Sequence, residues 1–454
     1  MKKIVAVSAG QEFSGKGDNA IRRNIRYLNY GLLGLATILN DVLEKEITVF
    51  QANYNTPIET VELIENAGID IENECECFLL SIPSYYSITW CQLFCKIVKQ
   101  TFNKKIIVGG RWVIDNNIEW IKKKLPYVDI IIEGFGEKRI CELFSSGISY
   151  PEIDGSKTTF SRLNYQLLYN YQEYQPCIEI SRGCGAGCQF CADRSNKRIR
   201  NKPVNKILQE VKYIEKIYSC LPYIYFEAPH FIFEKQWTHD FYKAMSIRNK
   251  KIGWRCTTRV ESVPINELKM LAETGLKVLD IGLESASFSQ LVKMGKTRSP
   301  GEYLCQAEKI LIESQKYGIW VKFNILLYAG ETYETLNETI RWLNEYKELI
   351  KDISVSSLIY YKNMKDISKI LKFGAHIPQG QKIEDLGFVN LDLSRQIDYF
   401  TAKKLCTEIP KKIANQRDFF DIKSVSYFMN GYTYNQFEKD LKLCSKEDLP
   451  FAIE

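Results

Sequence analysis

The chain has 454 residues, of which 45% are hydrophobic and 13% aromatic, and its 61 basic and 55 acidic residues leave a formal net charge of +6. This length and composition predict a globular protein of two or three domains with a large core and exclude a disordered chain. No basic stripe with interleaved aromatic residues indicates nucleic-acid binding, and no hydrophobic run approaches the ~20 residues of a membrane-spanning helix.

The 14 cysteines are spread along a chain whose first residues, MKKIVAVSAG, are typical of a buried strand and not of an export signal. We therefore expect a cytoplasmic protein whose thiols are mostly reduced and buried. Cys75 with Cys77, and Cys91 with Cys95, leave a second metal site open as an alternative to packing.

Residues 1–147 alternate β-branched runs with amphipathic helical segments, as in a parallel, doubly wound sheet covered on both faces. Strands are predicted at 2–9, 46–52, 77–84, 104–110 and from 128, and helices at 28–44, 56–68, 87–102 and near 116–125. Ligands bind such sheets at the carboxyl ends of the strands. These ends place Ser81, Gly109, Gly110 and Gly134 in a candidate site.

Residues 148–175 are rich in tyrosine without strong periodicity, and we interpret them as a linker. Strand–helix alternation then resumes and fits a partial (β/α)6 barrel over 176–360, followed by a mostly helical region over 361–454. The six barrel strands are predicted at 176–183, 223–228, 252–260, 277–285, 319–331 and 353–359. Barrel enzymes carry their chemistry on the loops that follow the strands.

Three cysteines, Cys184, Cys188 and Cys191, follow the first barrel strand in the segment SRGCGAGCQFCADRS. Soft thiolates on a short glycine-rich loop suit an iron–sulfur cluster, because each sulfur must reach a different iron. Three ligands for a four-iron cluster leave one iron open for a non-protein ligand. A partial zinc site or three chance cysteines is the alternative, although zinc normally takes four ligands and the nearest histidine is His230.

The Cys-x3-Cys-x2-Cys spacing, with Phe190 before the last cysteine, resembles the signature loop of the radical S-adenosylmethionine (SAM) enzymes. This resemblance implies a 4Fe–4S cluster whose open iron binds the amino and carboxylate groups of SAM. It also implies cleavage of SAM to a 5′-deoxyadenosyl radical, with an electron from an external flavodoxin- or ferredoxin-like donor.

Two later segments are similar to the same family. IGLESASFSQLVKMGK implies that Glu284 binds the SAM ribose or ammonium group and that Ser285 offers a hydroxyl; the alternative is that Glu284 caps the next helix. LLYAGET implies that Gly330 turns the chain near the adenine, although Tyr328 and Ala329 stand where the family often has Gly and Pro.

Charged residues at two other strand ends complete the candidate site. Glu227 and His230, in FEAPH, are candidate proton-transfer groups because histidine titrates near neutral pH. A surface role for His230 is the alternative. Arg255 and Arg259 frame the third barrel strand, where either could meet a carboxylate of SAM or of the substrate.

The first domain resembles the cobalamin-binding domain that precedes the radical SAM core in one subgroup, through GLLGLATIL, the strand ending at Ser81, VGG and EGFGEKRI. The resemblance implies that Gly109, Gly110 and Gly134 let the corrin and its nucleotide tail approach the backbone. No Asp-x-His-x-x-Gly motif is present and no histidine precedes His230, so a histidine-ligated cobalt is not expected. A relic domain that binds no corrin is the alternative.

In the resembled subgroup the C-terminal region caps the barrel and sets substrate choice, which we expect of residues 361–454. The leading hypothesis is a radical SAM enzyme with a 4Fe–4S cluster, SAM and cobalamin that methylates an unactivated carbon. Its substrate is expected to be a small molecule or a peptide, with no nucleic-acid or membrane partner. A radical rearrangement or cyclisation on the same scaffold, and a non-catalytic cobalamin-type sensor, are the alternatives.

Overall fold

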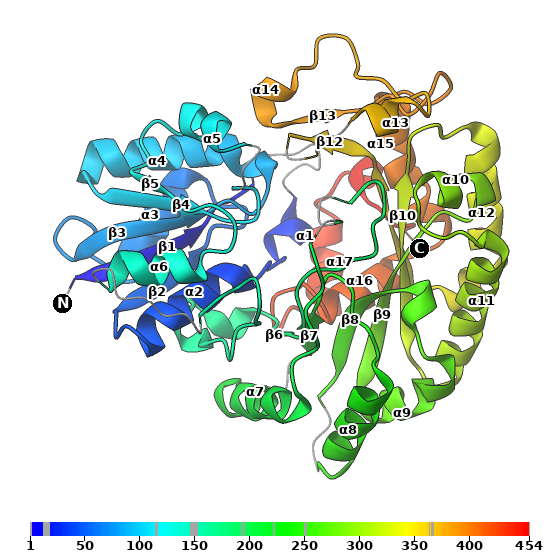
Figure 1. The fold of residues 1–454 in the computed structure, drawn as a ribbon, viewed down its shortest axis with the longest axis horizontal. Helices are drawn as coiled ribbons and strands as arrows, with labels where there is room; N and C mark the ends of the chain where they lie inside the picture. The colour runs from blue at the N-terminus through cyan, green and yellow to red at the C-terminus, as the bar shows by residue number, and fades with distance from the viewer. Residues whose placement is uncertain are drawn as a thin grey trace. The chain divides into compact units, whose positions relative to one another are not determined.

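The computed structural model of the protein describes residues 2–11, 19–113, 117–145, 153–191, 194, 196–220, 223–248, 252–362, 364 and 367–453. The chain forms two compact units (Figure 1). Unit 1 comprises Met1–Tyr174 with Ile383–Phe388, and unit 2 comprises Gln175–Lys382 with Val389–Glu454. The predicted boundary between residues 147 and 148 lies outside the described residues, so that division of the chain stays a prediction.

Unit 1 is built on a five-stranded parallel sheet with strand order β2-β1-β3-β4-β5. Its strands are β1 (Lys3–Ser8), β2 (Ile47–Gln51), β3 (Cys75–Ser81), β4 (Lys105–Gly109) and β5 (Ile130–Ile131). Its helices are α1 (Ala20–Arg23), α2 (Tyr30–Asp41), α3 (Pro57–Asn66), α4 (Ile88–Phe102), α5 (Ile118–Lys124) and α6 (Glu137–Phe144). The strand order reverses direction at β1 and β3, which is the switch point where such sheets bind ligands.

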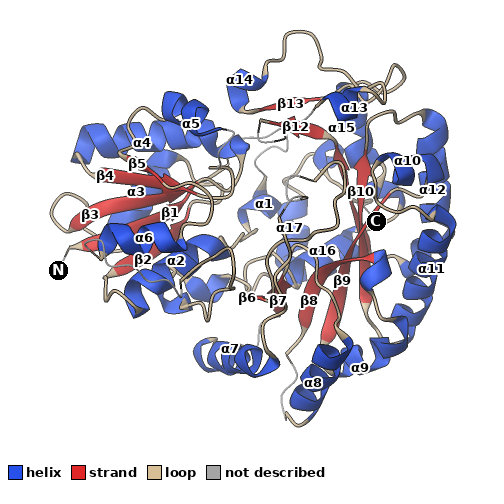
Figure 2. Ribbon diagram, in the orientation of Figure 1, coloured by secondary structure: helices blue, strands red, loops and turns tan. Residues whose placement is uncertain are grey.

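Local sequence explains these elements. The strands are buried almost throughout, because helices cover both faces of the sheet: α2 packs with α6, and α3 with α4, on opposite faces (Figure 2). Helix α3 begins with Thr56 in a capping box with Glu59 and with Pro57 in its first turn. The doubly wound sheet predicted for this part of the chain is confirmed.

Unit 2 is built on a six-stranded parallel sheet in sequential order, β11-β10-β9-β8-β7-β6. Its strands are β6 (Cys177–Glu179), β7 (Ile224–Glu227), β8 (Trp254–Arg259), β9 (Leu276–Glu284), β10 (Trp320–Leu327) and β11 (Asp352–Ser357). The helices between them are α7 (Val204–Ile217), α8 (Lys235–Ser246), α9 (Leu268–Glu273), α10 (Phe288–Lys293), α11 (Pro300–Lys316) and α12 (Tyr333–Glu345). The predicted partial (β/α)6 barrel is confirmed.

One face of this sheet is aromatic. On the face toward α8, Phe226 stacks on Trp254 with ring centroids 4.8 Å apart, and Phe241 contacts both rings. Since alternate residues of a strand face opposite sides, the neighbouring residues Tyr225 and Arg255 lie on the other face, which is the interior of the barrel.

The interior face is polar. The Lys322 ammonium lies 3.2 Å from both oxygens of Asp280, and the Asn324 amide donates to the same carboxylate at 2.6 Å. Although burial alone raises the pKa of Asp280, Lys322 and Arg255 bring it below its usual value, so the carboxylate stays ionised. The Arg255 guanidinium lies 3.9 Å from the ring centre of Tyr225. These buried charges are stable because they are paired.

The C-terminal region contributes to both ends of this barrel. Its elements are β12 (Ile359–Tyr361), α13 (Ser368–Leu371), α14 (Ile383–Leu386), β13 (Phe388–Asn390), α15 (Tyr399–Glu408), α16 (Gln416–Ser424) and α17 (Tyr434–Leu441). At the carboxyl ends of the strands, the carbonyl oxygen of Leu393 accepts the backbone N–H of Gly330 at 2.7 Å.

At the amino ends, α16 and the residues after it close the barrel. Ile422 and Val425 pack against Val278 and Trp320 near the starts of β9 and β10. The Lys351 ammonium, just before β11, pairs with α16 carboxylates, at 2.5 Å from Asp418. The contact of α16 with the barrel therefore lies at the edge of the sheet opposite to the cysteine loop.

Residues 383–388 belong to unit 1 and pack on it, which the sequence did not indicate. The Trp120 indole donates to the carbonyl oxygen of Glu384 at 2.8 Å, and the Phe388 ring lies 4.6 Å from that of Tyr86. A Cβ atom on Gly387 would lie 2.7 Å from the Tyr85 ring, so this close contact requires glycine.

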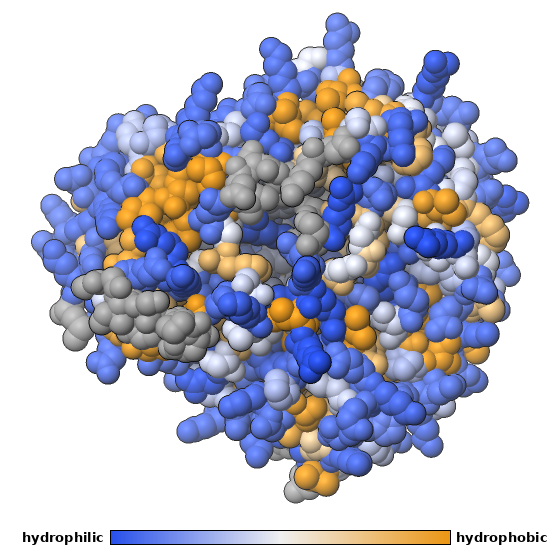
Figure 3. Space-filling model, viewed as in Figure 1, coloured by the Kyte–Doolittle hydropathy of each residue, from blue (hydrophilic) through white to orange (hydrophobic). Residues whose placement is uncertain are grey.

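The face of the protein shown in Figure 3 is mostly hydrophilic, with hydrophobic residues gathered over β4 and β5. The isoleucines of β5 are half-buried and Phe135 is 53% exposed. Among the described residues, no helix has the length and apolar character needed to cross a membrane.

Replacing Ile422 with alanine should destabilise unit 2 by about 2–5 kcal/mol, because the substitution leaves a cavity beneath β9 and β10. Equilibrium urea denaturation measures this loss. Ile312→Ala, at a position that is 41% exposed on α11, is the matched control and should change stability by less than about 0.5 kcal/mol. Equal effects of the two substitutions would contradict the packing of α16 described above.

Candidate functional site

The three clustered cysteines lie on the loop that follows β6. Cys188 is buried, Cys184 and Cys191 are half-buried, and none of the three is in a disulfide bond. Gly183 precedes them with φ of 69°, and a Cβ atom there would lie 2.2 Å from the carbonyl oxygen of Lys197. This glycine therefore lets the two sides of the loop pass close together.

Buried ion pairs hold the base of this loop. The Arg182 guanidinium donates to both carboxylate oxygens of Glu179, at 2.7 and 3.1 Å. On the returning side, Lys202 pairs with Glu210 on α7, and both side chains are buried. The loop is thus fixed at both ends by charges that are hydrogen-bonded and shielded from water.

Arg259, at the end of β8, contacts the cysteine loop directly. Its Nη1 donates to the Cys188 Sγ at 2.9 Å and its Nη2 to the carbonyl oxygen of Lys296 at 2.8 Å. Its Nε donates to the carboxylate of Glu261 at 2.5 Å. Gln189 adds a backbone bond to the carbonyl oxygen of Met294 at 2.9 Å. The cysteine loop and residues 294–296 are therefore joined through Arg259.

Glu284, at the end of β9, lies in the same group. The Lys296 ammonium donates to its carboxylate at 3.1 Å, and both side chains are largely buried. Glu284 has φ of 68°, an uncommon conformation for a residue with a side chain. A Cβ atom on Gly282 would lie 2.4 Å from the Glu284 carboxylate, so the glycine in GLES makes room for this ion pair.

Ser285 lies beside Glu284 but faces α12. Its hydroxyl is 3.0 Å from that of Thr339 and also accepts the backbone N–H of Ser287 at 3.0 Å. The side chain is buried, with these groups as its partners. Its observed contacts therefore fix the turn after β9, and its predicted role as a hydroxyl donor to SAM stays a prediction.

Phe190 and Gly330 lie in the same part of unit 2. The Phe190 ring packs edge-on against Tyr328, with centroids 6.3 Å apart. The Tyr328 hydroxyl is buried and has no hydrogen-bond partner among the described residues. Gly330 has φ of 73°, and its carbonyl oxygen accepts the Lys293 ammonium at 3.2 Å. The predicted fifth-strand segment is thus beside the cysteine loop.

His230 is buried, which excludes the surface role considered from the sequence. Its Nε2 is 2.7 Å from the Ser262 hydroxyl, and its Nδ1 has no partner among the described residues. Burial, together with the Arg259 guanidinium, lowers the pKa of His230 to about 4. Its ring is therefore neutral near pH 7. Glu227 is half-buried at the end of β7, where its backbone carbonyl accepts the N–H of Ile180.

In unit 1, the predicted residues gather at the carboxyl ends of β1, β3 and β4. The Asn29 side chain donates to the hydroxyls of Ser8 and Ser81, both at 3.0 Å, and so spans the switch point. A Cβ atom on Gly110 would lie 2.7 Å from the backbone of Ile82, so β4 approaches β3 closely there. The Gln51 Nε2 is buried and has no partner among the described residues.

Two predicted glycines complete this edge. Gly109 is the last residue of β4, and its carbonyl oxygen accepts the N–H of Ile82 at 2.9 Å. Gly134 has φ of 64°, and no atom of the described residues lies within 4 Å of an added Cβ atom, so the space beside it is open with respect to that part of the chain.

The structure adds residues that the sequence reasoning missed: Lys296, Met294, Asn29 and Gln51. Lys296 ends the family-like segment MGK, which is a signal that could have pointed to it. Asn29 and Gln51 carry no such signal. Within the described part of the chain, no three His, Cys, Asp or Glu side chains converge on a single metal ion.

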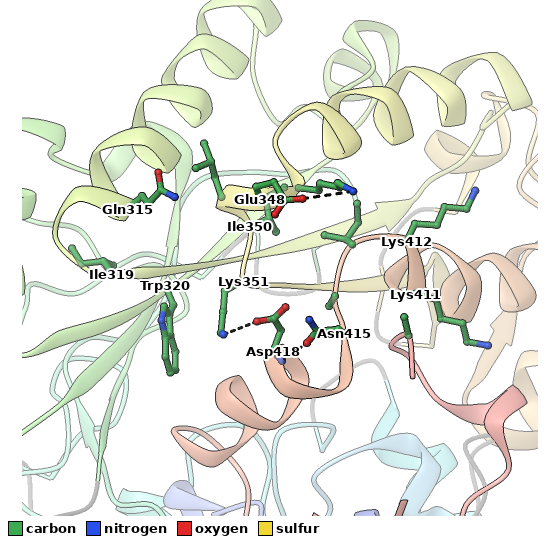
Figure 4. Close-up of a pocket in the computed structure, with 16 residues that line it drawn as sticks. Gln315, Ile319, Trp320, Glu348, Ile350, Lys351, Lys411, Lys412, Asn415 and Asp418 are labelled. Carbon is green, nitrogen blue, oxygen red and sulfur yellow. Dashed lines mark hydrogen bonds and ion pairs between the residues drawn. The ribbon is translucent and has the colours of Figure 1, made fainter. Parts of the chain in front are cut away.

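A surface pocket lies at the amino-terminal edge of unit 2, away from these residues. Figure 4 shows Trp320 and the Lys351–Asp418 ion pair among the side chains that line it. Its walls come from the starts of β10 and β11 and from residues 411–418. Since barrel chemistry occurs at the carboxyl ends of the strands, this pocket is not the candidate site.

The low pKa of His230 predicts a pH dependence of stability. An unfolded chain takes up this proton below pH 6.5, whereas the folded protein takes it up only near pH 4. The contribution of His230 is therefore complete above pH 6.5 and is lost as pH falls toward 4.

Urea denaturation at pH 7 and pH 5 tests this dependence. His230→Gln should lose less stability between the two values than the wild type does. His239→Gln, whose side chain is 45% exposed, is the control and should behave as the wild type. A wild-type loss unchanged by His230→Gln would count against the buried neutral ring.

Comparison with known proteins agrees with this geometry. Residues 178–343 match the profile of the Radical SAM superfamily. An uncharacterized methyltransferase of Pyrococcus horikoshii is 22% identical over 280 residues, which cover 54% of this chain and 59% of that protein. The chain thus spans little more than half the length of this curated relative.

Two solved structures share the fold. OxsB, a cobalamin-dependent SAM radical enzyme solved with aqua-cobalamin and SAM, has 15% identity and a TM-score of 0.64, over 93% of this chain and 70% of that one. The match to apo OxsB covers 76% of this chain and 52% of that one. The methyltransferase TsrM from Kitasatospora setae, solved with cobalamin and a 4Fe–4S cluster, has 12% identity and a TM-score of 0.64, over 100% and 93%. Residues 178–343 are therefore a radical SAM domain, and the chain has the fold of cobalamin-dependent radical SAM enzymes.

Proposed function

We propose that this radical SAM enzyme binds cobalamin and methylates an unactivated carbon of a small molecule or peptide. The observation that carries the proposal is a series of contacts at the carboxyl ends of the barrel strands: Cys188 bonds Arg259, Arg259 bonds the Lys296 carbonyl, and the Lys296 ammonium pairs with Glu284. Barrel enzymes bind and transform their substrates at this edge.

The residues of the loop fit a 4Fe–4S cluster. Three cysteines follow one another on a loop in which no described residue lies within 4 Å of a Cβ atom added to Gly185 or Gly187. Each thiolate of such a loop binds a different iron, so convergence on one ion is not required. When bound, the cluster supplies the electron that cleaves SAM to methionine and a 5′-deoxyadenosyl radical.

The surrounding side chains would position SAM. Glu284, paired with Lys296, offers carboxylate oxygens to hydroxyl or ammonium groups. The Tyr328 hydroxyl, which no described residue bonds, offers a hydrogen bond, and the ring of Phe190 offers an apolar surface. Glu227 and His230, whose ring is neutral near pH 7, are the proposed proton-transfer groups after β7.

The carboxyl edge of unit 1 fits cobalamin. Asn29 and Ser81 offer polar atoms at the β1/β3 switch point, and the Gln51 Nε2, which has no partner among the described residues, lies at the end of β2. Gly110 keeps the backbone of β3 and β4 close, and the open space at Gly134 gives access for a flat ring. When bound, cobalamin supplies the chemistry for methyl transfer to carbon. The cobalamin-bound structures of OxsB and TsrM support this assignment.

The substrate class rests on comparison. TsrM has been solved with tryptophan and a SAM analogue bound, and it shares the fold of this chain with a TM-score of 0.63. We therefore propose a small-molecule or peptide substrate, with a flavodoxin- or ferredoxin-like protein as the electron donor.

Replacing Cys184, Cys188 or Cys191 with alanine should abolish SAM cleavage, because a cluster with two protein ligands is not retained. Anaerobic reconstitution followed by iron counting and chromatography of 5′-deoxyadenosine and S-adenosylhomocysteine measures both properties. Cys305→Ala, at an exposed thiol of unit 2, should leave both unchanged. A fully assembled cluster that yields neither product would favour a sensor over an enzyme.

Gly134→Trp should weaken aquacobalamin binding at least about tenfold, because the indole would fill the open space at the carboxyl end of β5. Absorbance titration measures the affinity. Gly68→Trp is matched to it, since Gly68 also has positive φ and nothing within 4 Å of an added Cβ atom but precedes β3 at the opposite edge. Wild-type protein that binds no cobalamin would support the relic domain instead.

A further inference from the structure

The Arg259 guanidinium has an unusual set of partners. Each of its three nitrogens has a protein acceptor: the Cys188 Sγ at 2.9 Å, the carbonyl oxygen of Lys296 at 2.8 Å and the Glu261 carboxylate at 2.5 Å. Arg259 is 8% exposed and Cys188 is 5% exposed. A positive charge is therefore held against a ligand sulfur where water screens it little.

Cys188 is distinguished from the other two cysteines of the loop by its burial. Cys184 and Cys191 are half-buried and so lie closer to solvent. The hydrogen bond from a cation to Cys188 thus acts on the most buried of the three cysteines. Hydrogen bonds to the ligand sulfurs and burial are among the factors that set the reduction potential of an iron–sulfur cluster.

We propose that Arg259 is a positioning residue that raises the reduction potential of the cluster through its hydrogen bond to Cys188. Reduction adds one electron to the cluster and makes it more negative. The guanidinium stabilises that state more than the oxidised state, so an external donor of given potential transfers the electron more completely. The inference rests on the proposed function, because it requires a cluster on the three cysteines.

The sequence-based expectation that Arg259 binds a carboxylate of SAM makes a different prediction. A SAM ligand would affect the affinity for SAM and leave the cluster unchanged when SAM is absent. Arg259 acting on Cys188 changes the cluster without SAM. The two roles are therefore separable in the same protein.

Glu261 provides a variant that leaves Arg259 in place. Its carboxylate accepts from Nε and neutralises part of the guanidinium charge, and its side chain is 49% exposed, so folding should tolerate substitution. Glu261→Gln should shift the potential in the positive direction, whereas Arg259→Gln should shift it in the negative direction. A purely structural role of Arg259 predicts no such opposition.

The test is a redox titration of the reconstituted full-length protein without SAM, with the reduced cluster followed by electron paramagnetic resonance and the signal normalised to bound iron. We expect Arg259→Gln to lower the one-electron equilibrium constant about tenfold, which equals a shift of 59 mV for a one-electron couple. Arg259→Lys, which keeps the positive charge, should shift the reduction potential less than Arg259→Gln does. Arg194→Gln removes another cation of the same loop, one that bonds Gln189, and it should also shift the reduction potential less than Arg259→Gln does.

Three results would overturn the inference while leaving the proposed function intact. The first is an unchanged reduction potential in Arg259→Gln together with weaker SAM binding. The second is a potential shift in Glu261→Gln of the same sign as in Arg259→Gln. The third is loss of the cluster in both Arg259→Gln and Arg259→Lys. A wild-type protein that assembles no cluster would instead refute the proposed function itself. The inference and its premise therefore fail in distinguishable ways.

Discussion

The candidate site depends on the fact that parallel strands end at one edge of their sheet. Arg259 contacts Cys188 although 71 residues separate them, because β6 and β8 end at the same edge of the sheet with only β7 between them. Glu284 joins them from β9 through Lys296. No single segment carries this arrangement: the thiols, the guanidinium and the carboxylate come from three strand ends, and the sheet brings them together.

The same barrel keeps charge in its interior and must therefore pair it. Asp280, Lys322 and Asn324 bond one another across β9 and β10, which offsets the cost of burying a carboxylate and an ammonium. Helix α16 then closes the amino ends of the strands through Ile422 and Lys351. This contact lies at the edge opposite to the cysteine loop, whereas Leu393 of the same C-terminal region bonds Gly330 at the edge where the loop lies.

In unit 1, too, polar side chains meet at the carboxyl ends of parallel strands, although the strand order differs. Its sheet reverses direction at β1 and β3, and Asn29 bridges the hydroxyls of Ser8 and Ser81 at that point. No histidine of this unit is available to ligate a cobalt, since the first histidine of the chain is His230. Whatever binds there meets hydroxyls, amides and glycine backbone, which is a surface suited to hydrogen bonds and close approach.

The sequence alone determined the helices, the strands and the cysteine loop, because the periodicity of hydrophobic residues and the spacing of cysteines depend only on residues close together in the chain. The fourth barrel strand, expected at 277–285, is Leu276–Glu284, and the spacing of the three cysteines was enough to propose them as cluster ligands. The tertiary structure decided the partners. It turned the Ser285 hydroxyl to Thr339, 54 residues away, directed Arg259 to a thiol, and packed residues 383–388 on unit 1. Such contacts join residues far apart in the chain, and they follow from packing and from the pairing of buried polar groups, which no local pattern records.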